Sequence, residues 1–283
     1  MNIRVETLYN QGSASIPEDG FIVTPPYFCV ADGVSAPNDQ VENPHLIYRG
    51  GLTGGQMAVK QIQTAFSSAD PKDSLRDILI PANRKIMAEH LFCQGILPRE
   101  TEKMGAATFV AAKLEKGSVS VIQGGDCFAI LKTKDEGFRV TKNQVFKHDL
   151  VLKERIEDLR QKYQDDKQVW YGLRPLMIEL RKAHANQLVR DGYAVLNGQS
   201  DVAKCWNAFR MPASNLQYML LFSDGFVPFE KTEKEMILGD WVTNLYEKGG
   251  LARVLQETRT EAKSARENPY FAEATALAVT FIS

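Results

Sequence analysis

Two apolar runs of this chain end in the same dipeptide, Asp-Gly. The segments FCVADGVS (28–35) and MLLFSDGF (219–226) both have the composition of a buried strand until Asp32 and Asp224 interrupt them. Asp-Gly is a common turn dipeptide, so a single instance is explained most simply as a turn. A buried carboxylate without a partner is costly, however, and the repetition therefore indicates that something compensates these charges.

Further acids stand beside other apolar runs, at Asp126, Glu273, Glu18 and Asp19. Strands packed in adjacent sheets can bring their ends to one edge, where clustered carboxylates repel one another unless a cation neutralises them. Oxygen ligands of this kind suit Mg²⁺ or Mn²⁺. The glycine after the first aspartate, Gly33, allows close approach of the backbone, so its carbonyl is a further candidate ligand.

The other metal-binding residue types do not support a different metal. None of the four histidines adjoins these acids or forms an H-E-x-x-H motif, and the four cysteines form no C-x-x-C pair, which disfavours zinc. Cysteines without a disulfide framework are typical of intracellular proteins, and the first residues show no apolar segment of a signal peptide. We therefore expect a cytoplasmic location.

The formal net charge of −1 produces no overall field that would favour nucleic acid or an acidic membrane surface. The longest uncharged stretch, Met211 to Ser223, is much shorter than the roughly 20 residues that cross a bilayer. We therefore expect neither nucleic acid nor a membrane as a partner.

The order of the periodic segments predicts an α+β fold in one domain, residues 1–283. Strands are predicted in residues 3–31, from 106 to about 142, at 193–198 and 217–224, and at 274–282. Helices are predicted over 54–66, over 74–92 with a kink at Pro81, and over 240–247 and 251–265. The charged segment Leu150 to Arg190 is predicted to form two helices or an insertion. Strands gathered into sheets and covered by helices are the economical arrangement.

These motifs resemble the metal-dependent serine/threonine protein phosphatases of the 2C type, in particular their bacterial members. The matching segments occur in the order of that family over nearly the whole chain: ED (18–19), VADG (30–33), GGQMA (54–58), GAAT (105–108), GGDC (124–127), FSDG (222–225) and AEAT (272–275). The resemblance implies a four-layer αββα sandwich, with two central antiparallel β-sheets flanked by helices. It also implies a metal centre at one end of the sheets.

The resemblance further implies a role for each acid. Asp32 would bridge two Mn²⁺ or Mg²⁺ ions, with Glu18 and the Gly33 carbonyl on one ion. Asp224 and Glu273 would bind the other ion. Two such ions about 3.5–4 Å apart would activate a water that attacks phosphoserine or phosphothreonine, which makes Asp32 and Asp224 the candidate catalytic residues.

Two more acids and one segment complete this assignment. Asp126 would help to hold a third ion, and Asp19 would orient a ligand or a metal-bound water. The segment at about 148–200 falls where the family keeps a variable flap beside the active site. The implied partners are a phosphorylated protein substrate and a cognate Ser/Thr kinase, and we expect a monomer.

Three departures from the family pattern leave a second function open. Glu273 is one methylene longer than the usual aspartate, Ala14 replaces a phosphate-holding arginine, and Val34 replaces a histidine of the animal members. The alternative is a phosphatase-like adaptor that binds regulatory partners with little or no catalysis. A nucleotide-binding enzyme is a weaker third hypothesis. Its support is the glycine spacing in GGLTGGQM (50–57), which lacks the Lys-Ser/Thr of a phosphate loop.

Overall fold

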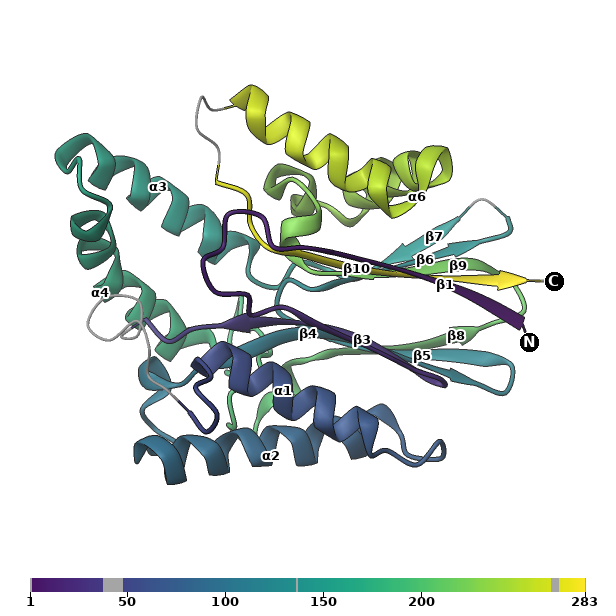
Figure 1. Ribbon diagram of the computed structural model, residues 1–283, viewed down its shortest axis with the longest axis horizontal. Coiled ribbons are helices and arrows are strands. Elements are labelled where there is room, and N and C mark those ends of the chain that lie inside the picture. Colours follow the sequence, from purple (N-terminus) through teal and green to yellow (C-terminus); the bar gives the residue numbers. More distant parts are fainter. Residues whose placement is uncertain (1, 38–47, 136, 266–269, 283) are drawn as a thin grey trace.

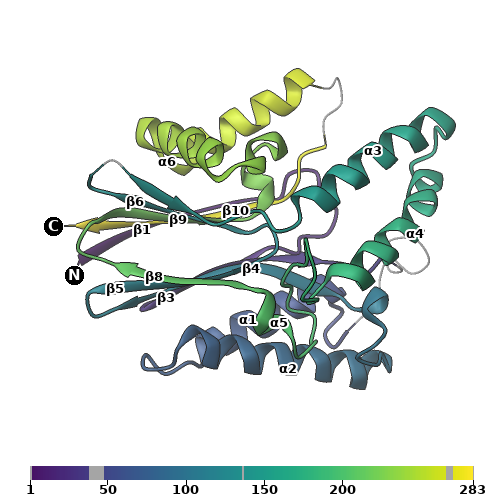
Figure 2. The ribbon, with the colours of Figure 1, turned by 180° about the vertical axis from the view of Figure 1, so that it is seen from behind.

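The computed structural model describes residues 2–37, 48–135, 137–265 and 270–282. Two antiparallel sheets of five strands each pack face to face, and helices cover both outer faces (Figure 1). Two further helices, α3 (Phe146–Lys162) and α4 (Asp166–His184), lie beyond one end of the sheets, as the reverse view also shows (Figure 2). The predicted α+β fold, a four-layer αββα sandwich, is confirmed.

Each sheet combines strands from distant parts of the chain. The first sheet has the order β1 (Asn2–Asn10), β10 (Ala274–Ile282), β9 (Leu216–Phe222), β6 (Phe128–Thr133) and β7 (Phe138–Val140). The second sheet has the order β2 (Gly20–Thr24), β3 (Tyr27–Val34), β4 (Ala106–Glu115), β5 (Ser118–Gly124) and β8 (Asn207–Pro212). Because the first strand pairs with the last, both ends of the described chain lie at one end of the sandwich (Figure 1).

The apolar run of β3 is explained by burial on both faces of its sheet. Phe28 and Val30 belong to the core between the two sheets, whereas Cys29 and Ala31 belong to the core beneath the helices α1 (Gly54–Ser67) and α2 (Leu75–Gln94). All four side chains are fully buried. A strand covered on both sides has no solvent-facing positions, so its sequence is continuously apolar instead of alternating.

The predicted helices are present, with boundaries set by local capping. Thr53 and Ser74 form capping boxes at the starts of α1 and α2, and α2 continues through Pro81. The helix α6 (Glu235–Ala265) covers the first sheet and is interrupted at Gly249 and Gly250, where the sequence analysis separates two helices. The shorter helical elements are η1 (Thr101–Lys103), α5 (Val202–Cys205), η2 (Asp224–Phe226) and η3 (Phe229–Glu233). Among the helices in the described ranges, none has the length and apolarity that a bilayer crossing requires.

The strand prediction for residues 193–198 is wrong, and one strand was missed. Residues 193–198 form only isolated bridges, between Ala107 and Leu196 and between Ala185 and Tyr193. Leu196 is fully buried although it belongs to no strand, so burial alone explains the apolar, strand-like composition of this segment. The missed strand is β8, which pairs with β5 at the sheet edge and alternates between half-buried and exposed residues.

A close backbone contact explains one glycine at the start of α1. A Cβ atom on Gly54 would lie 2.8 Å from the Cα atom of Gly105, which immediately precedes β4. We therefore expect Gly54→Ala to lower the free energy of unfolding by about 1–3 kcal/mol, although alanine is the better helix former. Urea denaturation measures this change. The exposed Lys60→Ala on the same helix is the control and should shift stability by less than about 0.5 kcal/mol. An unchanged or increased stability of Gly54→Ala would contradict the contact.

Candidate metal centre

Strand register brings three acids of the first sheet to one end. Phe222 at the end of β9 pairs with Ala276 of β10 on one side and with Phe128 of β6 on the other. The acids just beyond these paired positions are Asp126, Asp224 and Glu273. Three segments that are far apart in sequence therefore deliver carboxylates to the same edge.

The second sheet contributes its acids at the same end. Gly20 of β2 pairs with Ala31 of β3, so that Glu18 and Asp19, which precede β2, lie next to Asp32 of β3. Asp32 does not close its strand as the sequence analysis assumes, because β3 continues to Val34 and Asp32 itself pairs with Thr108. This end of the sandwich is opposite the chain ends and is adjoined by α3 and α4 (Figures 1 and 2).

The start of α1 holds the Glu18 carboxylate. Ser35 donates its hydroxyl at 3.0 and 3.1 Å to the two oxygens, and the hydroxyl of the N-cap residue Thr53 donates to Oε1. Backbone glycines make the necessary room: a Cβ on Gly55 would lie 2.7 Å from Oε1, and a Cβ on Gly33 would lie 2.8 Å from the Glu18 Cβ. Burial raises the pKa of Glu18, and the two hydroxyl donors oppose that increase.

Glu273 uses both carboxylate oxygens in hydrogen bonds. The Tyr9 hydroxyl donates to Oε1 at 2.7 Å, and the backbone N–H of Glu18 donates to Oε2 at 2.7 Å. Burial and this hydrogen bond to Glu273 raise the pKa of Tyr9. The longer glutamate thus reaches β1 and the loop before β2.

Asp32 lies between two other carboxyl groups at the centre of the cluster. Burial and the charges of Asp19, Asp224 and Asp126 raise the pKa of Asp32 well above its ordinary value. The Asp32 carboxyl interacts with the carboxyls of both Asp19 and Asp224. Acids this close together cannot all be ionised unless protons or a cation neutralise them.

The pKa values of three neighbouring acids are raised as well. Burial and the charge of Glu273 raise the pKa of Asp19 to about 6. Desolvation and the charges of Asp126 and Asp19 raise the pKa of Asp224 to about 7. Asp224 keeps an exposed surface, so solvent limits the desolvation of this carboxyl. Burial also raises the pKa of Asp126, and a hydrogen bond from Thr108 opposes this.

The structure adds one acid that the sequence analysis missed. Asp149 in the first turn of α3 lies near Asp126 and Asp224, and burial together with these two charges raises the pKa of Asp149 to about 8. No sequence signal separates Asp149 from the many other acids of the charged segment. Only the direction in which α3 leaves the sheet brings this residue to the cluster.

His148 is also closer to the acids than its sequence position indicates. It is buried, its Nε2 lies 2.7 Å from the backbone oxygen of Asp191, and it lines a cavity of about 170 Å³ together with Asp126 and Asp149. Burial lowers the pKa of His148. A neutral imidazole at this position leaves the acids without a positive charge from histidine.

A cleft of about 500 Å³ opens above the acid cluster. Asp126, Asp149 and Asp224 form part of its lining, together with residues of η3, α6 and the segment before β10. A cavity of this volume is large enough for a small-molecule-sized group. The acid cluster is therefore accessible from a defined cleft.

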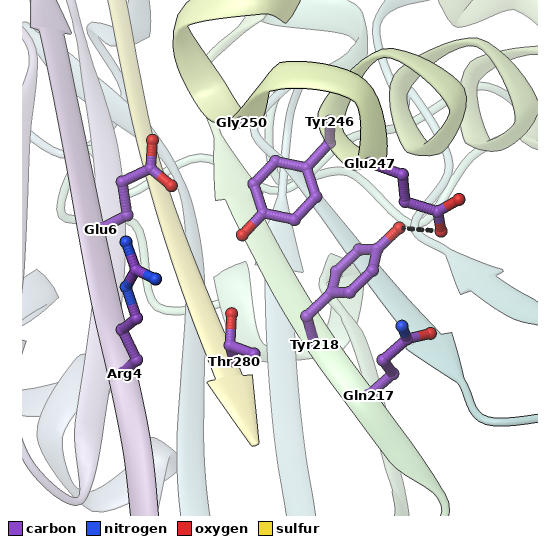
Figure 3. A pocket seen from close by; sticks show the side chains of 8 residues that line it. All are labelled: Arg4, Glu6, Gln217, Tyr218, Tyr246, Glu247, Gly250 and Thr280. Carbon is purple, nitrogen blue, oxygen red and sulfur yellow. Dashed lines mark hydrogen bonds between the residues drawn. The ribbon is translucent and has the colours of Figure 1, made fainter. Parts of the chain in front are cut away.

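A larger cavity of about 590 Å³ lies elsewhere, on the outer face of the first sheet beneath α6 (Figure 3). The Tyr218 hydroxyl donates to Glu247 at 2.9 Å, and Glu6 accepts from the backbone N–H of Leu251 at 3.2 Å. These contacts attach α6 to the sheet at its interruption. The lining of this larger cavity contains none of the clustered acids, so we place the candidate site at the cleft of about 500 Å³.

The chemistry of the donors fits a hard divalent cation. Within the residues that the structure describes, no three Asp, Glu, His or Cys side chains already have the geometry of a metal-ligand set. Glu18 and Glu273 are held by hydrogen bonds, and burial with neighbouring charges raises the pKa of the central Asp32. The cluster nevertheless consists of oxygen donors in need of positive charge, which is the donor set of Mg²⁺ or Mn²⁺.

Solved structures with this fold are serine/threonine phosphatases. The catalytic domain of PstP, in complex with two manganese ions, aligns with a TM-score of 0.57 and 15% identity over 99% of both chains. PppA, a key regulatory component of T6SS in Pseudomonas aeruginosa, aligns with a TM-score of 0.59 and 13% identity over 99% of this chain and 98% of PppA. Stp1 from Staphylococcus aureus aligns with a TM-score of 0.56 and 14% identity over 100% of this chain and 96% of Stp1. The sequence matches no family model and no curated protein. The chain therefore has the fold of the bacterial 2C-type serine/threonine phosphatases.

Proposed function

We propose that this protein is a metal-dependent phosphatase that hydrolyses phosphoserine or phosphothreonine in other proteins. The main support is the convergence of the six acids predicted from the sequence, together with Asp149, at one end of a phosphatase-type sandwich. Keeping these carboxyls together without a cation is unfavourable, so their convergence needs a function. The manganese ions reported for PstP are consistent with this proposal.

Each acid has a place in this proposal. Bound divalent cations would supply a water of lowered pKa and would neutralise phosphoryl oxygens. The residues that would hold them are Glu18, Asp32, the Gly33 carbonyl, Asp224 and Glu273, with Asp126 at a third position. Asp19, which accepts a hydrogen bond from the Ser223 hydroxyl at 2.8 Å, would orient its neighbours.

A cysteine nucleophile is not supported. Cys127 lies beside Asp126, but it is fully buried. Burial and the charges of Asp32 and Asp126 raise the pKa of the Cys127 thiol well above its ordinary value. A thiolate would be needed for nucleophilic attack, so this site suits attack by water.

Hydrolysis of p-nitrophenyl phosphate and of a phosphothreonine peptide, followed with Mn²⁺, with Mg²⁺ and with excess chelator, tests the proposed activity. We expect turnover with at least one metal and loss of activity to the background rate with chelator. Adding Mn²⁺ back to the chelated protein should restore the rate, which controls for irreversible unfolding. Activity that persists at full rate in chelator would refute the metal-dependent reaction.

The adaptor alternative has one observation in its favour. Each oxygen of Glu273 already accepts one hydrogen bond, from the Tyr9 hydroxyl or from the Glu18 backbone N–H, so only the remaining lone pairs could bind a metal. Calorimetric titration with Mn²⁺ separates the two functions, since an adaptor is expected to bind little or none. The cognate kinase, the monomeric state and the cytoplasmic location stay predictions from the sequence.

A further inference from the structure

The proposed function requires a protein cation that can bind the phosphate, and the described lining of the cleft contains two candidates, Lys153 and Arg259. The family resemblance implies an arginine at the position of Ala14, and the lining of the cleft includes Asp126, Asp149 and Asp224. We propose that Lys153 of α3 binds the phosphoryl group in this cleft and takes over the function of the missing arginine. This inference rests on the proposed function, because it names the residue that holds its substrate.

Lys153 is one helical turn from the acid cluster. Asp149 and Lys153 are four residues apart on α3 and therefore lie on the same face of the helix. Both line the cleft that also contains Asp126 and Asp224. A phosphoryl group above these acids would therefore be near the ammonium group.

An aromatic platform holds the ammonium group at the wall of the cleft. The Nζ atom of Lys153 lies 4.0 Å from the centroid of the Phe229 ring, and Phe229 stacks on Phe146 with centroids 4.7 Å apart. A cation over an aromatic face is attracted by the ring's electron density. This contact positions the side chain without neutralising its charge.

The present ionic partner of Lys153 can be exchanged. Nζ lies 2.9 Å from Oε1 of Glu230, and the side chains of the pair are 37% and 72% exposed. Such exposed pairs contribute only about 0–1 kcal/mol to stability. A phosphate dianion is a stronger acceptor, and Lys is a common point-charge ligand of phosphate. Transfer of Lys153 from Glu230 to a phosphoryl group should therefore be favourable.

The arginines that line the two cavities near the cluster have structural partners. Arg259 of α6, which lines the same cleft, donates to the backbone oxygen of Ala272 at 2.6 Å and to the side-chain oxygen of Asn10 at 3.3 Å. Arg181 lines the smaller cavity, is buried and donates to the backbone oxygen of Met104 at 2.9 Å. Both arginines are thus held by backbone oxygens. Among the described residues lining these cavities, Lys153 differs because its ionic partner is the exposed carboxylate of Glu230, which a phosphate can replace.

Calorimetric titration with inorganic phosphate in the presence of Mn²⁺ tests this inference on the full chain. We expect Lys153→Met to weaken phosphate binding about 10-fold or more, because a charge-assisted contact is lost. Lys153→Arg should retain binding within about 3-fold, since the charge is kept. The matched control is Lys147→Met on the same helix, because Lys147 pairs with Asp191 at 2.8 Å and does not line the cleft.

A second variant changes binding in the opposite direction. Glu230→Gln removes the competing carboxylate, so phosphate should bind about 2–3-fold more tightly, as expected for loss of an exposed ionic competitor. If the Lys153–Glu230 pair had a purely structural role, both Lys153→Met and Glu230→Gln would bind phosphate more weakly than the wild type. Equal phosphate affinity in wild type and Lys153→Met, or no phosphate binding by the wild type at millimolar concentration, would overturn the inference. If phosphate binds through Lys153 but no ester is hydrolysed, the inference stands and the proposed catalytic function fails.

Discussion

The Asp32→Asn variant is expected to lose phosphatase activity on the order of 10³-fold while keeping its fold. The Asp32 carboxyl interacts with those of Asp19 and Asp224, so it faces candidate ligands from both sheets. Removing its charge would cost several kcal/mol of transition-state stabilisation, and each 1.4 kcal/mol corresponds to about a factor of ten in rate. Initial rates with Mn²⁺ on p-nitrophenyl phosphate and on a phosphothreonine peptide measure this loss.

A surface aspartate provides the control for Asp32→Asn. Asp240 is exposed on α6, so Asp240→Asn should leave the rate within about 2-fold of the wild type. Circular dichroism and the unfolding transition show whether each variant is folded. A folded Asp32→Asn protein with more than about a tenth of the wild-type rate would refute the assigned role.

The second large effect is expected in the stability of the metal-free protein. Its melting temperature should fall as the pH rises from about 6.5 to about 8.5, because the folded chain holds protons that the unfolded chain has already released. The pKa of Asp224 is raised to about 7 and that of Asp149 to about 8. Stability contributed by these acids is complete below the unfolded pKa near 4 and is lost as the pH passes through the folded values.

The size of this effect follows from Asp149, which is less exposed than Asp224. Its raised pKa corresponds to a loss of about 2 kcal/mol across this interval, or about 4–8 °C in melting temperature for a chain of this size. Histidine contributes only near the lower limit of this interval. The pKa values of His148 and His90 are lowered in the folded chain, and in the unfolded chain these groups lose their remaining protons just above their ordinary pKa of about 6.5.

Two comparisons test the origin of this slope. Asp149→Asn removes one of the titrating acids, and saturating Mn²⁺ competes with the protons, so each should reduce the fall in melting temperature. Asp240→Asn should leave the slope unchanged, because it is exposed and outside the cluster. A melting temperature that is constant or rises over the interval in chelator would show that the acids do not repel one another as described.

The helices, the double burial of β3 and the interruption of α6 could be predicted from local signals. Capping residues, apolar spacing and a Gly-Gly pair act within a few residues and are visible without a partner. Residues 193–198 and β8 could not be assigned correctly in this way. Whether a segment becomes a strand depends on whether the edge of another strand is free to pair with it. The segment of β8 follows a long insertion and pairs with β5, which precedes that insertion in the sequence.

The candidate site shows the same division between local and long-range information. The motifs indicate Glu18, Asp32 and Asp224 because an acid next to an apolar strand is locally unfavourable and therefore noticeable. Asp149 and Lys153 lie in a helix full of charges, where nothing marks them as different from their neighbours. The hydrogen bonds of Glu273 were equally unpredictable, because they join residues separated by more than 200 positions.

The amino-acid sequence alone determined the α+β class, the strands that carry the clustered acids and the kind of ion those acids would suit. These properties follow from residue chemistry and from periodicities of a few positions. The tertiary structure decided which carboxyls touch, which hydroxyls hold them, and that α3 supplies both an acid and a lysine to the cleft. Those facts depend on strand register and on the direction of a helix, which are set by packing between distant segments and are not encoded in any one of them.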